Sequence, residues 1–439
     1  MPEALPSAHT TPSDAHIPKA RWYRMGSLLF FSYLVAYIDR TNMSIAAPAM
    51  KEELGLSQAQ IGVLLSAFFW GYVVSLGAAG WVVNRLGPKR TIVTALLVFG
   101  CASMATGVFT GTTQLLMVRA VLGLGEGLVY PAFTVCFVRW FPSWERGRAS
   151  MVSLITIPIS AIVMAPLGGW MISALDYRWM FILQGAPPVI AALLFAWLAA
   201  DHPEEDSRLS AAERTYVITN RAIGQTERGN LRDVLLNPKV WLFGVIYLLW
   251  VIGLYGFGQW LPTLLTELSG SGILTVGWLT AVPYGVAAVG MFLNALYSDR
   301  KPQQRTLFVA WPMLLAGVAL LISRALESSL SSSLVLLSIA CVGVHASFGP
   351  WWAWVLSFVP NSHAGTASGL VLAIGNFGGI IGPVLVGVLA GGADVATGYY
   401  VLGYPLVVAG LLALLLGLRN KTRRVAPSPA RGALGSVSR

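Results

Sequence analysis

The sequence predicts an all-α membrane protein, with twelve transmembrane helices in two pseudo-symmetric six-helix bundles. Three observations predict this fold. Of the 439 residues, 56% are hydrophobic and only 11% are charged, whereas about a quarter of the residues in a soluble domain carry a charge. The apolar residues gather into runs of about 20, the length that crosses a bilayer core as a helix. One long hydrophilic segment divides these runs six and six.

The predicted spans follow one another along the chain. They cover residues 23–48, 60–82, 91–110, 113–138, 149–173, 180–199, 240–263, 275–297, 306–323, 333–358, 364–391 and 398–418. The predicted domains are an N-tail (1–22), a first bundle (23–199), a linker (200–239), a second bundle (240–418) and a basic C-tail (419–439). The first twenty residues contain no apolar run, unlike a cleaved signal peptide, so we expect the first span to direct insertion.

The placement of Lys and Arg predicts the orientation. These residues gather in both tails, in the linker and in the loops after the second, fourth and eighth spans, while the opposite side carries few. Cytoplasmic loops have this excess, so we expect both termini in the cytoplasm. The short outer loops favour a bacterial inner membrane. The net charge of +10 is therefore explained by topology, and we expect the bilayer, not a nucleic acid, as the partner.

The two halves contain an internal repeat. The segment 142–149 reappears in part at 360–367, an offset of 218 residues. Three further matches have nearly the same offset: Pro166 with Pro383, Tyr37 with Tyr255, and Asn84-Arg85 with Asp299-Arg300. Two parallel repeats facing each other across a central site are a known plan for transporters.

Four charged residues lie inside apolar runs, namely Asp39, Arg40, Arg119 and Glu126. A charge at the centre of a bilayer costs roughly 2.5–3.5 kcal/mol, so such residues usually mark an ion or substrate path. Their charges sum to zero. The repeat does not extend to them, because the positions that match Asp39 and Arg40 are Phe257 and Gly258.

Spacing suggests how these charges act. Arg119 and Glu126 share one helix face, about 10.5 Å apart along the axis, and Tyr130 shares that face. The helix also carries three glycines, at 123, 125 and 127, which permit close helix packing or approach of a substrate to the backbone.

A proton-coupled mechanism is one hypothesis. A carboxyl group in an apolar cavity can be neutral near physiological pH, whereas an arginine keeps its charge. Protonation of Glu126 would then free Arg119 to bind a substrate carboxylate. The structural alternative is a permanent Arg119–Glu126 or Arg40–Asp39 ion pair that holds helices in register.

Other polar residues in the spans are candidate substrate ligands. Tyr37 and Tyr72 are hydroxyl donors or packing tyrosines. Gln259 lies in a segment rich in aromatic residues and helix breakers, over 254–262, that suggests a gate or a binding segment. Asn376 is a substrate ligand or bonds one helix to another.

Several motifs resemble those of the major facilitator superfamily, over essentially the full chain. The segment 80–90, Gly-Trp-Val-Val-Asn-Arg-Leu-Gly-Pro-Lys-Arg, is similar to the signature of the loop between its second and third helices. Within it, the chain most resembles the anion:cation symporters, bacterial permeases for hexonates, tartrate, phthalate and hydroxyphenylacetate. The motifs that carry this resemblance lie at 37–42, 70–72, 119–131 and 375–383.

The resemblance implies proton-driven uptake of an organic anion by alternating access. The protonatable acids of the family fall on Asp39 and Glu126, and its anion-binding arginines on Arg40 and Arg119. It also implies a gating function for the loops that contain Asn84, Arg85, Gly87, Arg90, Asp299 and Arg300. The loop departs from the family at Asn84, where an Asp that helps to latch one conformation is usual.

Competing functions stay open. On the same fold, the protein could exchange organic anions or export drugs, and an exchanger would not need a titrating acid. An enzyme would need a nucleophile, base or metal cluster, and a sensor a large output domain. The sequence predicts none of these, so we expect no enzymatic activity, cofactor or metal site. We expect a monomer. Few amides lie in the spans, and a buried hydroxyl without a partner costs about 1–3 kcal/mol, so an aromatic or small aliphatic carboxylate is favoured over a sugar acid.

Overall fold

The computed structural model describes residues 19–142, 144–221, 231–323, 329–358, 364–391 and 394–425. Within these ranges the chain forms helices and no strands. Most of both predicted tails, part of the linker and residues 360–363 of the repeat lie outside the described residues.

Consecutive helices account for most of the described chain. The first half contains η1 (Trp22–Gly26), α1 (Ser27–Leu54), α2 (Gln58–Leu86), α3 (Pro88–Val108), α4 (Thr112–Glu126), α5 (Val129–Trp140), α6 (Arg146–Leu154), α7 (Thr156–Ala174) and α8 (Tyr177–Leu198). Between the halves lie η2 (Pro203–Glu205), α9 (Ala211–Asn220) and α10 (Leu231–Leu235). The second half contains α11 (Pro238–Ser269), α12 (Ile273–Arg300), η3 (Pro302–Gln304), α13 (Arg305–Ser323), α14 (Leu330–Ala346), α15 (Phe348–Leu356), α16 (Ala364–Leu389), α17 (Val395–Val401) and α18 (Gly403–Val425).

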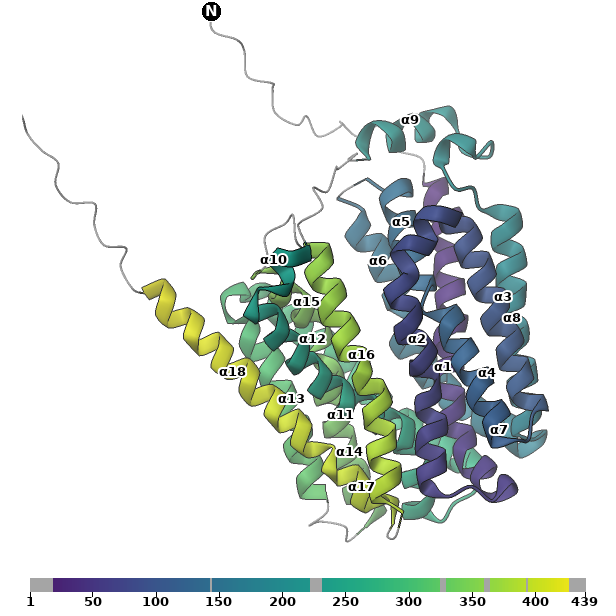
Figure 1. Cartoon of the computed structure of the whole chain (residues 1–439), viewed down its shortest axis with the longest axis vertical. Coiled ribbons are helices and arrows are strands. Elements are labelled where there is room, and N and C mark those ends of the chain that lie inside the picture. Colours follow the sequence, from purple (N-terminus) through teal and green to yellow (C-terminus); the bar gives the residue numbers. More distant parts are fainter. Residues whose placement is uncertain are drawn as a thin grey trace, which may run out of the picture.

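Two bundles stand side by side (Figure 1). We call α1–α8, drawn in purple to teal, the N-bundle, and α11–α18, drawn in teal to yellow, the C-bundle. Eleven helical stretches of the described chain are long and apolar enough to cross a membrane. The remaining predicted span is α1, whose hydropathy is lowered by the polar residues Asp39, Arg40 and Asn42 in its middle.

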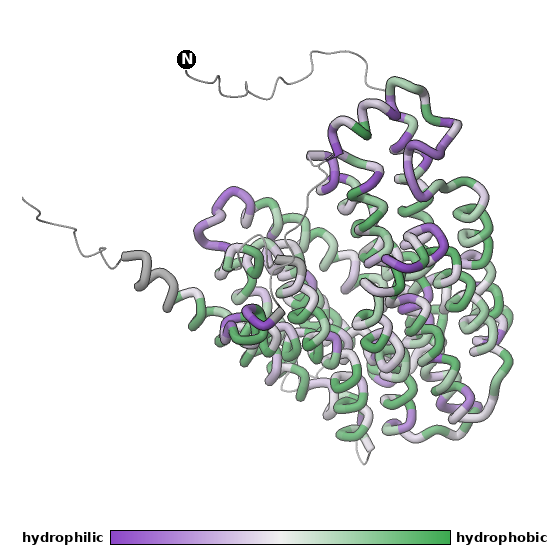
Figure 2. Tube along the Cα trace, turned by 45° about the horizontal axis from the view of Figure 1, so that its top comes forward, coloured by the Kyte–Doolittle hydropathy of each residue, from purple (hydrophilic) through white to green (hydrophobic). Residues whose placement is uncertain are grey.

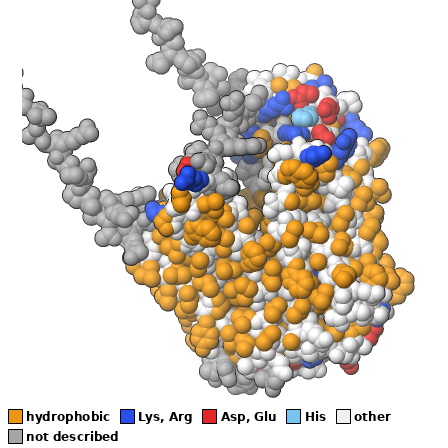
Figure 3. Space-filling model, viewed as in Figure 1, with side chains coloured by type: hydrophobic (Ala, Val, Ile, Leu, Met, Phe, Trp, Pro, Cys, Tyr) orange, Lys and Arg blue, Asp and Glu red, His pale blue; other side chains and the backbone are white. Residues whose placement is uncertain are grey.

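Both bundles have surfaces suited to lipid. Apolar side chains cover the visible sides of the two bundles, and charged side chains gather at the ends (Figure 3). Large apolar residues of the helices, such as Leu193 and Phe292, are more than half exposed. The chain is hydrophobic along most of the bundles and hydrophilic around α9 (Figure 2). In a bilayer, helices satisfy their own backbone hydrogen bonds, which explains why they alone make up the described fold.

The two bundles touch at one end, where α2 packs on α16 and α7 packs on α12. A Cβ atom at Gly62 would lie only 2.7 Å from the carbonyl oxygen of Pro383, and one at Gly277 only 2.5 Å from that of Ala165. Glycine lets backbones approach this closely. Towards the other end, where α9 and α10 lie, the bundles diverge (Figure 1).

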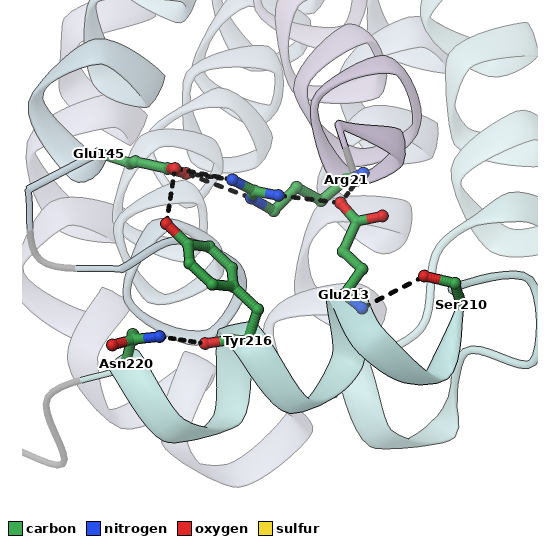
Figure 4. A network of polar contacts seen from close by, with 6 residues as sticks. All are labelled: Arg21, Glu145, Ser210, Glu213, Tyr216 and Asn220. Atoms are coloured by element: carbon green, nitrogen blue, oxygen red, sulfur yellow. Dashed lines mark hydrogen bonds and ion pairs between the residues drawn. The ribbon is translucent and has the colours of Figure 1, made fainter. Parts of the chain in front are cut away.

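The helix α9 is fastened to the N-bundle by a buried ionic cluster (Figure 4). Arg21, 2% exposed, pairs with Glu145 at 2.7 Å and with Glu213 of α9 at 3.0 Å. The Tyr216 hydroxyl donates to Glu145 over 3.4 Å, and the Ser210 side chain caps the first turn of α9. The first part of the linker is therefore a fixed part of the N-bundle.

Candidate substrate and proton site

Close packing of α2 on α4 positions the four buried charges. A Cβ atom at Gly71 would lie 1.9 Å from the carbonyl oxygen of Ala120, and one at Gly123 would lie 1.9 Å from that of Phe68. Only glycine permits this approach, so of the two functions predicted for the glycines of this helix, Gly123 serves close packing. Arg119 and Glu126 of α4 consequently face α1, which carries Asp39 and Arg40.

The charges pair between helices and not along one helix. Arg40 Nε donates to Glu126 Oε1 in an ion pair. Arg119 Nη1 lies 3.9 Å from Asp39 Oδ2. Neither form of the structural alternative, a permanent Arg119–Glu126 or Arg40–Asp39 ion pair, is therefore seen among the described residues. Two turns of helix separate Arg119 from Glu126, and adjacent residues such as Asp39 and Arg40 point in directions about 100° apart on a helix.

The two arginines differ in exposure. The Arg40 side chain is 9% exposed, whereas that of Arg119 is 1% exposed. Arg119 Nε and Nη1 donate no hydrogen bond to any protein atom of the described chain. The Arg119 side chain is thus buried more completely than that of Arg40.

Asp39 accepts hydrogen bonds from two polar side chains in addition to its contact with Arg119. Its Oδ1 accepts hydrogen bonds from Asn42 Nδ2 at 2.7 Å and from Ser103 Oγ at 2.5 Å. Asp39 itself is fully buried. Ser103 of α3 was not among the predicted site residues, because a lone serine in an apolar span carries no signal of its own.

Aromatic side chains surround Arg40. Its Cζ lies 4.5 Å from the ring centre of Tyr37, 4.7 Å from that of Tyr72 and 5.3 Å from that of Phe68. Cation–π contacts of this kind stabilise a desolvated guanidinium by about 2 kcal/mol. Arg40 Nη1 also donates towards the hydroxyls of Tyr37, at 3.4 Å, and of Tyr255 in α11, at 3.3 Å. Tyr37 and Tyr72 therefore both contact Arg40, and their use as substrate ligands stays a prediction.

Tyr255 of the C-bundle contacts this cluster, and it was not among the predicted site residues. Its signal was present in the sequence, since the internal repeat pairs it with Tyr37. Two C-bundle residues, Gln259 and Asn376, were predicted as substrate ligands. Asn376 Nδ2 donates to the Leu372 carbonyl of its own helix at 2.8 Å, and its use as a substrate ligand stays a prediction. Gln259 is buried one turn beyond Tyr255, and its Oε1 accepts no hydrogen bond from the described residues.

Tyr130 is separated from the helix face of Glu126. The helix α4 ends at Glu126, and α5 begins at Val129, so the expected continuous face is interrupted. The Tyr130 hydroxyl instead lies 3.1 Å from Ser150 Oγ of α6.

The predicted gating residues lie at the diverging end of the bundles, apart from the four charges. Arg85 rests on the ring of Trp81, and Arg300 on that of Tyr297. Asn84, Arg90 and Asp299 are exposed, and Gly87 has a positive φ of 80°, which favours glycine.

The acid that contacts the first of these loops comes from the linker. Asp201 Oδ1 accepts the Lys89 backbone N–H at 2.9 Å, at the start of α3, and lies 3.9 Å from Arg139 Nη1. A Cβ atom at Gly87 would lie 3.3 Å from the same oxygen. The sequence analysis missed Asp201, because it is distant in sequence from the loop.

No set of three or more metal-ligating acids, histidines or cysteines occurs within the described part of the chain. The site is a buried, electrically balanced cluster on α1 and α4 of the N-bundle, which Tyr255 of the C-bundle contacts. Buried charges of this kind in membrane-spanning helices usually mark an ion or substrate path, which is typical of a membrane transport protein.

The chain belongs to the Major Facilitator Superfamily, whose family profile matches residues 29–383. It is 30% identical over 392 residues to the probable sulfoacetate transporter SauU of Cupriavidus necator, covering 87% of this chain and 88% of that one. It is 27% identical over 427 residues to the D-galactonate transporter of Escherichia coli, covering 92% of this chain and 97% of that one.

A solved structure supports the same fold. The crystal structure of a bacterial homolog of the human lysosomal transporter Spinster, in an inward-facing and unoccupied conformation, matches with a TM-score of 0.73 and 19% identity, covering 94% of this chain and 99% of that one. The predicted all-α, major facilitator fold is thereby confirmed, and the protein is a multi-pass membrane transporter.

Proposed function

We propose that this protein takes up a small organic anion together with a proton. The observation that carries the proposal is the ion pair between Arg40 and Glu126, in which the more exposed arginine is neutralised by a buried carboxylate. An arginine that binds a substrate carboxylate must first lose such a partner. Two relatives named for the organic acids sulfoacetate and D-galactonate favour an anion as the substrate.

The pairing changes the mechanism that the sequence suggested. Protonation of Glu126 removes its charge and releases Arg40, which then binds a substrate carboxylate through its Nη atoms. The cluster is neutral before this step and neutral after it, because one proton and one carboxylate have been added. A neutral occupied site can change its exposure between the two sides of the membrane without moving a bare charge through the bilayer.

The second pair has a different function in this proposal. Asp39 faces the inaccessible Arg119 and is held by Asn42 and Ser103. We assign Arg119 to the positioning of Asp39 and of the α1–α4 contact. Asp39 stays a predicted second proton site, since a carboxylate with a partner at 3.9 Å is less tightly paired than Glu126.

The direction of transport depends on the orientation. With both termini in the cytoplasm of a bacterium, as the basic loops predict, the contacts between α2 and α16 and between α7 and α12 close the outer side. The diverging end then faces the cytoplasm, where anion and proton leave. The loops of Asn84 and Asp299 lie at this end and would close in the opposite state.

Proton flux tests the proposal. The purified protein is placed in liposomes that hold a pH dye, and aromatic, aliphatic and sugar acids are added outside one at a time. We expect proton entry that depends on one class of acid and on the protein. Entry of a radiolabelled acid without proton movement would instead support an anion exchanger. Failure of every acid to move, with export of a drug panel, would support drug efflux on the same fold.

A further inference from the structure

Two tyrosines, one from each bundle, meet at a single nitrogen of Arg40. The Tyr37 hydroxyl lies 3.4 Å and the Tyr255 hydroxyl 3.3 Å from Nη1. The two tyrosines occupy matching positions of the internal repeat, but the position that matches Arg40 is Gly258. One arginine of the N-bundle is therefore shared by symmetry-related hydroxyls of both bundles.

The surroundings of Arg40 leave one direction for an anion. Its Nε faces Glu126, which even when protonated keeps a carbonyl oxygen that can accept this hydrogen bond, and its Cζ lies over the rings of Tyr37 and Tyr72. A carboxylate binds a guanidinium best in its plane, by parallel N–H bonds. The Nη edge is the part of the group at which such a bond can form, and both hydroxyls stand beside it.

The Tyr255 hydroxyl can act as a donor at this edge. A phenol hydroxyl that accepts a hydrogen bond from Arg40 still has its own proton to donate. A carboxylate oxygen bound at Nη1 would lie within reach of that proton. The same anion would then be held by a cation of the N-bundle and a hydroxyl of the C-bundle.

Tyr255 also connects this edge to the contact between the bundles. Its ring lies 4.3 Å, centre to centre, from that of Phe69 in α2. Phe69 in turn packs on α16, since a Cβ atom at Gly379 would lie 2.4 Å from its ring. A change in the position of Tyr255 would thus be transmitted directly to the packing of α2 on α16.

We propose that Tyr255 is the substrate-positioning residue of the C-bundle. Its hydroxyl donates to the substrate carboxylate that Arg40 holds, so that binding of one anion engages both bundles and the α2–α16 contact at once. The inference rests on the proposed function, and it assigns to Tyr255 the place that the sequence analysis gave to Gln259 and Asn376.

Binding measurements on Tyr255→Phe test this inference. Tyr399→Phe is the matched control. The Tyr399 hydroxyl, from α17, donates at 3.2 Å to the carbonyl of Phe257 in α11, the helix of Tyr255, and not to Arg40. Affinity for the acid that the wild type transports is measured by titration calorimetry, and substrate exchange is measured in liposomes. We expect Tyr255→Phe to weaken binding about tenfold, or about 1.4 kcal/mol, and to slow exchange. Tyr399→Phe should keep the wild-type affinity.

Each outcome decides between the two proposals. If Tyr255→Phe binds the acid as tightly as the wild type, or if Tyr399→Phe loses as much affinity, Tyr255 is a packing residue and the inference is wrong. If the wild type itself binds no organic acid, the proposed function fails and this inference fails with it.

Should Tyr255→Phe not fold, Tyr255→His supplies a hydroxyl-free donor at the same position. Retention of affinity by Tyr255→His would then support the inference, and its complete loss would oppose it.

Discussion

Arg40 of α1 pairs with Glu126 at the end of α4, while its chain neighbour Asp39 faces Arg119, two turns earlier on the same α4. The helix α4 therefore supplies the partners of both Arg40 and Asp39, at two positions about 10.5 Å apart along its axis. The separation lets one pair open while the other stays closed.

Glu126→Gln should abolish proton-driven uptake and leave substrate exchange intact. The amide cannot take up or release a proton, and it leaves Arg40 free in every state of the cycle. Dye-reported proton flux and exchange of labelled acid are measured on the same liposomes. Glu53→Gln, at an exposed acid that pairs with Arg178, is the control and should behave as the wild type. Normal proton flux in Glu126→Gln would remove Glu126 from the coupling step.

Replacement of each arginine by lysine should separate their functions. Arg40→Lys should weaken substrate binding tenfold or more, because lysine offers a point charge where arginine offers a planar fork of donors. Arg119→Lys should change substrate affinity much less, since Arg119 is only 1% exposed, and should instead lower thermal stability. Titration of the transported acid into each variant measures this. Equal losses of affinity would mean that both arginines bind the substrate.

Gly123→Ala should destabilise the protein and reduce transport. The new methyl group would lie 1.9 Å from the Phe68 backbone, which no side-chain rotation can relieve, and overpacking of this kind costs about 1–3 kcal/mol. It would also move Arg119 and Glu126 away from α1. Gly77→Ala on α2, which meets nothing within 4 Å, is the control. Thermal unfolding and uptake are compared, and a stable, active Gly123→Ala would contradict the packing argument.

Loss of Arg21 from the ionic cluster at α9 should destabilise the protein more than loss of Glu213. Arg21→Gln leaves Glu213, which is fully buried, without its cation, and breaking a buried pair in this way costs about 3–5 kcal/mol. Glu213→Gln should cost less, because Arg21 keeps Glu145. Unfolding of each bundle is followed by thiol labelling of buried Cys136 and Cys341 in a Cys101→Ser background. A larger loss of stability in Glu213→Gln than in Arg21→Gln would contradict this prediction.

Much of the fold was predictable, because lipid imposes a simple rule on the sequence. Runs of about 20 apolar residues must be helices, and the eleven described helical stretches long and apolar enough to cross a membrane overlap the predicted spans. Charged residues inside such runs are conspicuous for the same reason, so Asp39, Arg40, Arg119 and Glu126 could be selected as the site. Tyr37 and Tyr72 followed from their place beside these charges in the motifs.

The pairing within the site was not predictable in this way. Sequence spacing places Arg119 and Glu126 on one face, but it does not say how far α1 is rotated towards that face. Tyr130 was misplaced because the break between α4 and α5, after Glu126, leaves no strong mark in the sequence. Asp201 and Ser103 were missed because each acts through a contact with a residue far away in the chain.

The sequence by itself determined that this protein crosses the membrane, which residues carry charge into it and that the two halves repeat. These properties follow from the composition of each segment taken alone. Only the tertiary structure decided that Arg40 is paired with Glu126, that Arg119 is buried beside Asp39 and that Tyr255 contacts Arg40 from the other bundle. Such pairings depend on the rotation and separation of helices, and glycine contacts such as Gly123 against Phe68 set them.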